Sequence, residues 1–108
     1  MNSELTPLER ACVELVAKEH WPEFRIDGLR VTKRENTGVG RYVHMEDLHE
    51  QHLVDGVYET RERAVEMEGV KLGLDFAIAV QSSRIVHLEL VTAGSDGWDG
   101  VEREWTIV

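Results

Sequence analysis

The sequence predicts an α+β domain, in which an N-terminal amphipathic helix packs on a mainly antiparallel, curved β-sheet of about five to seven strands. Two observations support this. Apolar residues recur at helical spacing over about residues 6–19, whereas from about residue 24 to residue 108 they alternate with polar residues at a period of two. Short turns, and no second helix, separate the strand segments, which is typical of an antiparallel sheet. With 108 residues, we expect a single domain over residues 1–108.

The predicted helix begins with a capping box. Thr6 is a good N-cap, Pro7 occupies the first helical position, and Glu9 stands three residues after Thr6. Pro22 ends the helix, because the residue before a proline disfavours helical dihedral angles. The expected apolar face consists of Leu8, Ala11, Cys12, Leu15 and Val16.

Alternation then predicts strands through the first half of the chain. The candidates are residues 24–28, 29–34 and 39–45. Asp27 and Gly28 form a typical hairpin turn between the first two candidates. In the third, Tyr42 and His44 fall on the face opposite Val43. Residues 46–62 are polar, and we expect a long loop there, which in a compact domain is usually functional or mobile.

The second half is predicted to be β-structure. The candidates are residues 64–72 with a bulge at Gly69, then residues 72–80, 85–92 and 101–107. In residues 72–80 the small residues Ala77 and Ala79 alternate with large apolar ones. In residues 85–92, His87 and Glu89 fall on the face opposite the residues Val86, Leu88 and Leu90.

Composition excludes several classes of function. The net charge of −9 leaves no basic footprint for nucleic acid or for an anionic membrane surface. Cys12 is the single cysteine, which excludes an internal disulfide and a cysteine-rich zinc site. No apolar run is long enough to span a bilayer. The chain starts without a basic, apolar leader, so we expect a cytoplasmic protein.

No catalytic motif is present, and we expect no catalytic residue, no cofactor and no bound metal. His49 and His52 are three residues apart, whereas the zinc-binding His-Glu-x-x-His motif needs a spacing of four. Three alternatives remain open. One is a small enzyme or ligand-binding domain with a pocket between helix and sheet, lined by Tyr42, His44 and His87. Another is a metal site that uses His44 with His49 and His52. The third is a subunit that pairs through an exposed sheet edge.

Acidic residues concentrate in two stretches. Residues 43–70 contain eight acidic and two basic residues, and residues 89–108 contain five and one. We expect the two stretches to frame one acidic surface that attracts a basic protein. Trp98 would be its aromatic anchor at a loop tip, unless the indole folds back onto the sheet. The expected partner-contact residues are Glu46, Asp47, Glu50, Asp55, Asp96, Trp98 and Asp99.

Four segments of the chain resemble a known family. Residues 37–42, 74–80, 84–90 and 97–99 are similar to small bacterial immunity proteins, which are found beside polymorphic or contact-dependent growth-inhibition toxins. The resemblance implies a cytoplasmic protein that binds and neutralises a cognate toxin domain, and it brings no catalytic residue. The acidic surface implies that this toxin domain is basic. A nuclease would fit, because it must hold phosphate.

Overall fold

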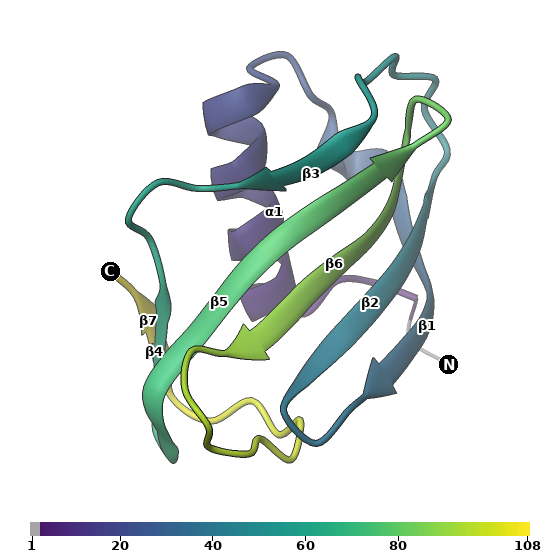
Figure 1. Cartoon of the computed structure of the whole chain (residues 1–108). Helices are drawn as coiled ribbons and strands as arrows, with labels where there is room; N and C mark the ends of the chain where they lie inside the picture. Colours follow the sequence, from purple (N-terminus) through teal and green to yellow (C-terminus); the bar gives the residue numbers. More distant parts are fainter. Residues whose placement is uncertain (1–2) are drawn as a thin grey trace.

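The computed structural model describes residues 3–108 and has the predicted α+β architecture (Figure 1). The expected domain of residues 1–108 also includes residues 1 and 2, which lie outside the described part. The elements are α1 (Pro7–His20), the 3₁₀ turn η1 (Ile26–Gly28), β1 (Leu29–Asn36), β2 (Gly40–Asp47), β3 (Gly56–Glu59), β4 (Val65–Met67), β5 (Val70–Gln81), β6 (Arg84–Thr92) and β7 (Trp105–Ile107).

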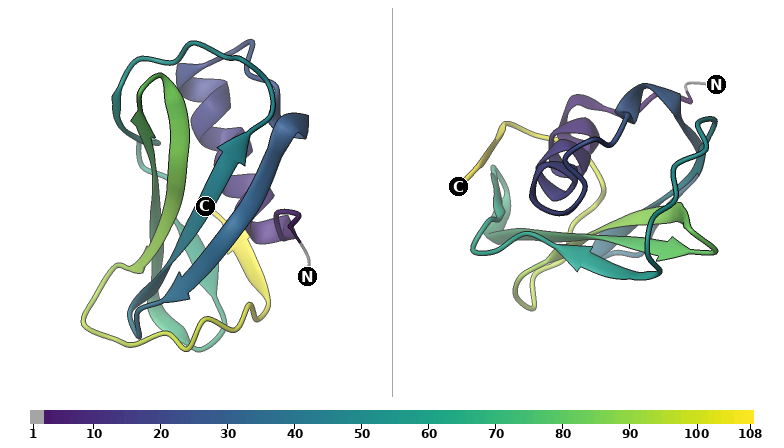
Figure 2. Two further views of the ribbon diagram at one scale, coloured as in Figure 1. Left: turned by 90° about the vertical axis from the view of Figure 1, so that its right-hand side faces the viewer. Right: turned by 90° about the horizontal axis from the view of Figure 1, so that it is seen from above.

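All strand pairs in the seven-stranded sheet are antiparallel. The strand order is β1-β2-β6-β5-β4-β7. On the side of β5 away from β6, β4 pairs with residues 70–74 and β3 pairs with residues 77–80. The helix covers one face of this sheet and leaves the opposite face open (Figures 1 and 2). Within residues 3–108, no helix has the length and hydrophobicity needed to cross a membrane.

The start of α1 confirms the predicted capping box. The backbone N–H of Glu9 donates to Thr6 Oγ1 over 3.2 Å, and the N–H of Thr6 donates to Glu9 Oε1 over 2.9 Å. The buried face is rotated from the expected one. Ala11 and Leu15 are only half-buried, and the fully buried positions are Leu8, Glu9, Cys12, Val13, Val16 and Ala17.

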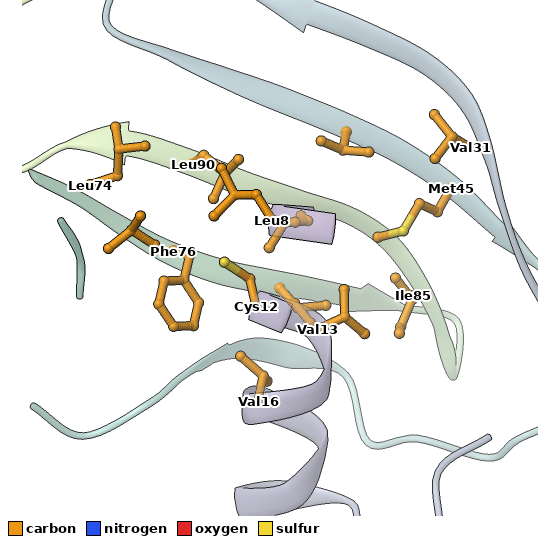
Figure 3. Close-up of a cluster of buried hydrophobic side chains, with 14 of the residues drawn as sticks. Leu8, Cys12, Val13, Val16, Val31, Met45, Leu74, Phe76, Ile85 and Leu90 are labelled. Carbon is orange, nitrogen blue, oxygen red and sulfur yellow. The ribbon is translucent and has the colours of Figure 1, made fainter. Parts of the chain in front are cut away.

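Apolar side chains from α1 and the sheet form the core between the two layers (Figure 3). Leu8 on the helix lies near Leu90 on β6, and Cys12 lies near Phe76 on β5 (Figure 3). Burying a side chain of this size stabilises the fold by roughly 1.5–3 kcal/mol. This core fixes the sheet and therefore the positions of the side chains on its open face.

A buried ion-pair network joins the helix to the sheet and to the C-terminal segment. Arg34 on β1 binds Glu9 through two hydrogen bonds of 2.7 and 2.9 Å. Arg41 on β2 lies 3.0 Å from Glu9 and 2.6 Å from Glu102. Arg41 also donates to the carbonyl of Gly100. Four charged side chains thus replace the apolar packing that the helix pattern predicts at this end of the core.

Two strand predictions are wrong because of backbone geometry. Residues 24–28 do not form a strand, and Ile26–Gly28 makes the 3₁₀ turn that leads into β1. Residues 64–72 do not form one bulged strand. The chain instead reverses at Gly69, which has a φ of +84°, and so separates β4 from β5. Leu72 is therefore 63% exposed, and the buried alternation of β5 begins only at Leu74.

Other details also differ from the prediction. The expected loop of residues 46–62 contains β3, which is short, and the last strand covers only Trp105–Ile107. In β6 the buried side chain is Ile85 rather than Val86, since the register with β5 shifts between Ala79 and Val80.

Candidate functional site on the open face of the sheet

The face of the sheet away from α1 carries the candidate site. On β2 the side chains of Val43 and Met45 are buried beneath the sheet, so Tyr42 and His44 project from the open face. The same alternation on β5 turns Ala77 and its outward-facing neighbours to this face. Antiparallel pairing then aligns these side chains in rows that run across the strands.

One row alternates acidic side chains with a tyrosine and an alanine. In order across β1, β2, β6, β5 and β3, its members are Glu35, Tyr42, Glu89, Ala77 and Glu59. Neighbouring strands lie about 4.8 Å apart, so consecutive carboxylates of the row lie on strands about 10 Å apart. Glu89 is a hydrogen-bond partner and a negative charge beside Tyr42, and it raises the pKa of that phenol above its ordinary value.

The next row contains two histidines in contact. Its members are Lys33, His44, His87, Ala79 and Val57. The rings of His44 and His87 lie 5.8 Å apart, and the Tyr42 ring lies 5.1 Å from that of His87. His44 Nε2 lies 2.8 Å from Glu35 Oε1. Burial lowers the pKa of His87, and the charge of His44 lowers it further against the opposing effect of Glu89, so His87 is neutral at pH 7.

A hollow of about 260 Å³ opens above Ala77. Its residues are Glu59, Thr60, Arg63, Asp75, Phe76, Ala77, Glu89 and Val91. Three carboxylates, from β3, β5 and β6, therefore face one guanidinium. Within residues 3–108, none of Glu59, Asp75 and Glu89 forms an ion pair. Arg63 Nε instead donates to the carbonyl of Val108 over 3.1 Å.

Sequence reasoning missed this set because it depends on strand pairing. Alternation predicts that Glu89 and His87 share a face, and that Tyr42 and His44 share one. It does not predict which strands are neighbours, and Glu59 lies in a segment expected to be a loop. The sequence signal that could have found them is that each lies at an outward-facing position of its strand.

The predicted contact residues of the first acidic stretch have varied environments. Glu46 is exposed on β2, and Glu50 is exposed in the following loop. Asp47 is buried, where it accepts hydrogen bonds from the His49 N–H and from Gln51 Nε2. Asp55 accepts from the backbone N–H groups of Ser82 and Ser83 and so holds the β5–β6 turn. Asp47 is therefore structural, and Asp55 is partly committed to the turn.

The prediction of an exposed aromatic anchor is wrong. Trp98 is 3% exposed, and its Nε1–H donates to the carbonyl of Val101 over 3.0 Å. The guanidinium of Arg41 lies 5.0 Å from the centre of its ring, which is the geometry of a cation–π contact. The alternative, an indole folded back onto the sheet, is the observed arrangement.

Asp96 and Asp99 flank this indole in the loop after β6. Asp96 is half-buried, and Asp99 is exposed. Arg103 donates to both carboxylate oxygens of Asp99, over 3.0 and 2.7 Å, and lowers the pKa of that carboxyl to about 2. The charge of Asp99 is therefore shared with an internal guanidinium.

The predicted contact residues at 46–50 and at 96–99 do not frame one surface. The loop with Trp98 lies at the β1–β2 turn, where the Trp98 N–H donates to the carbonyl of Gly38 over 2.9 Å. Residues 46–50 lie at the other end of β2, where the Leu48 N–H donates to the carbonyl of Gly28. An eight-residue strand separates them, a length of about 25 Å.

The structure also does not bring together the residues of the two alternative sites predicted from histidines. Tyr42, His44 and His87 do not line a pocket between helix and sheet, because they project from the opposite face. His49 Nε2 lies 3.2 Å from Asp27 Oδ1, away from His44. Within residues 3–108, no group of three or more histidine, cysteine or acidic side chains is placed to hold a metal ion.

Comparison with known proteins gives no relative from which a function can be transferred. No model of a protein family, no curated protein and no solved structure matches this chain. The function must therefore be inferred from the geometry of the open face.

Proposed function

We propose that this chain is a cytoplasmic binding protein of the immunity type, which captures a basic toxin domain through the open face of its sheet and so neutralises the toxin. The observation that supports the proposal is the uncovered sheet face, on which Glu59, Asp75 and Glu89 line a hollow together with the single cation Arg63, and form no ion pair among residues 3–108. The net charge of −9 adds a long-range attraction for a cationic partner.

The sheet suits capture because its strands hold the backbone of the acidic residues in place before a partner arrives. Little conformational entropy is then lost on binding, which favours affinity. Carboxylates at the rim speed association, and groups that are desolvated in the complex slow dissociation. A nuclease is the simplest target, since a surface that holds phosphate is complementary to carboxylates.

The contact set differs from the one predicted from composition. Of the seven residues predicted from sequence, Glu46 is the one on the open face, and we add Glu59, Asp75 and Glu89 with the ring of Tyr42. Tyrosine is common among residues that dominate binding energy, because it combines a large apolar area with a polar group.

Copurification with a toxin domain encoded beside the gene of this protein tests the proposal. We expect a complex that inhibits the toxin and that weakens as salt rises. Amide hydrogen exchange of the complex should show protection on the outward-facing residues of β2, β5 and β6, with α1 unchanged. Protection confined to the helix layer, or a complex insensitive to salt, would contradict binding by the open face.

A further inference from the structure

We infer that the hollow above Ala77 is a binding site for an arginine side chain of the partner. This inference rests on the proposed function, that the open face binds a basic protein, and it names the group that the face recognises. The argument uses the floor of the hollow, its charges and the rigidity of its walls.

The hollow is deep at Ala77 because the small methyl group of this residue lies between two long acidic side chains. Ala77 on β5 is paired directly with Glu89 on β6 and with Glu59 on β3. A larger side chain at this position would occupy part of the space of about 260 Å³ above the alanine. Val91 contributes an apolar wall beside Asp75, its partner in the register. The hollow therefore offers an apolar base below a charged rim.

The charges of the hollow favour a guanidinium. Its carboxylates come from three strands, so they approach a bound group from different sides. A guanidinium presents five N–H donors in a plane and can bond two carboxylates at once, while its aliphatic stem packs on alanine and valine. An ammonium group is a compact, strongly hydrated charge, and it gains less from separated acceptors.

The one cation in the lining of the hollow, Arg63, forms a hydrogen bond elsewhere and no ion pair with the three carboxylates among residues 3–108. Arg63 Nε donates to the carbonyl of Val108. The guanidinium of Arg63 thus leaves the three carboxylates without an ion pair among residues 3–108. An incoming arginine would supply the missing counter-charge.

The walls of the hollow are held from both layers of the molecule. Glu89 is paired with Tyr42 across β6 and β2, so the tyrosine stands beside its carboxylate. The carbonyl of Glu59 accepts a hydrogen bond of 2.6 Å from His20 Nε2 at the end of α1, which fixes the backbone of β3. The backbone that carries the rim is therefore in place before a ligand enters, and this reduces the entropy lost on binding.

Titration of the ¹⁵N-labelled chain with hexa-arginine, and separately with hexa-lysine, tests the inference by NMR. We expect hexa-arginine to shift the amide signals around Ala77 and to bind about tenfold more tightly than hexa-lysine, a difference of about 1.4 kcal/mol. Ala77→Leu obstructs the floor of the hollow without changing any charge and should remove this preference. Ala79→Leu is the matched control, since Ala79 faces outward on the same strand and does not line the hollow.

Asp75→Asn provides a second variant that keeps the shape of the hollow, should Ala77→Leu fail to fold. It should weaken hexa-arginine binding more than hexa-lysine binding. Equal affinities for the two peptides, or an arginine preference that survives in both variants, would overturn the arginine site. The proposed function would still stand in that case if the toxin domain protects the open face. If neither the peptides nor the toxin domain perturb that face, both proposals fail.

Discussion

Glu9 performs two tasks with one carboxylate. It completes the capping box with Thr6, and it neutralises Arg34 and Arg41 where the helix meets the sheet. Burial raises its pKa, but the hydrogen bond from Arg34, the Thr6 N–H and the charges of both arginines lower it by more, so the net shift is downward. Its contribution to stability is complete above the ordinary glutamate pKa of about 4.3 and is lost as the pH falls through the lower folded value.

Glu9→Gln should therefore lower the free energy of unfolding by about 3 kcal/mol at pH 7, because it leaves Arg34 without its carboxylate partner and Arg41 with Glu102 alone. Urea denaturation measures the change. Glu14→Gln is the control, since the Glu14–Arg10 pair of 3.1 Å is exposed, and its loss should cost less than about 0.5 kcal/mol. Equal effects of the two substitutions would contradict a structural role for the buried network.

Cys12 is a packing residue. It is fully buried, and burial together with the nearby charges of Glu102 and Glu9 raises the pKa of its thiol to about 12. We expect the folded protein to resist a thiol reagent at pH 8, and the urea-unfolded protein to react fully. Above about pH 8.5 the unfolded thiol ionises and the folded one does not, so the free energy of unfolding should fall as the pH rises. Rapid labelling of the folded chain would contradict this assignment.

At the scale of elements, β3 is the part of the open face with the weakest support. It has four residues and pairs only with β5. On its other side it is held by the hydrogen bond between His20 and the Glu59 carbonyl, and by the Tyr58 ring, which lies 4.8 Å from that of Trp21. The helix on one face of the sheet thereby positions an acidic residue on the other.

His20→Ala should loosen β3 without unfolding the molecule. Loss of one hydrogen bond is worth about 1 kcal/mol, so we expect amide exchange of residues 56–59 to become several-fold faster, with β6 unchanged. Lys18→Ala, in the same turn of α1, is the control and should leave both strands unaffected. Unchanged exchange in β3 would mean that pairing with β5 alone holds the strand.

The elements also show which features are predictable from sequence. The capping box and the alternation of β2, β5 and β6 are local patterns. They predict the fold class, and they predict that Tyr42, His87 and Glu89 face away from the core. The turn at Gly69 was mistaken for a bulge, because both use a glycine with positive φ. The rows of the open face depend on register between distant strands, and no local pattern encodes that register.

At the scale of the whole molecule, the positions of the acidic residues decide which surface can bind a cationic partner, more than the net charge does. The acidic residues chosen from composition are divided between the two ends of the sheet, and Asp99 is paired internally with Arg103. On the open face, by contrast, Lys33 and Arg30 lie on β1, whereas Glu46 lies on β2 and the three carboxylates around the hollow lie on β3, β5 and β6. The hollow is therefore the place where carboxylates of this face gather.

The most direct test of capture by the open face is the affinity of the toxin domain for two variants that carry the same change in charge. One combines Glu59→Lys, Asp75→Lys and Glu89→Lys. The other combines Glu14→Lys, Glu19→Lys and Glu23→Lys, on or just after α1 in the opposite layer. Calorimetry at 0.15 M salt should give an affinity at least a hundredfold weaker for the first variant, about 2.7 kcal/mol, and a change below tenfold for the second. Equal losses in the two variants would show that net charge alone governs binding, and would contradict the assignment of the open face.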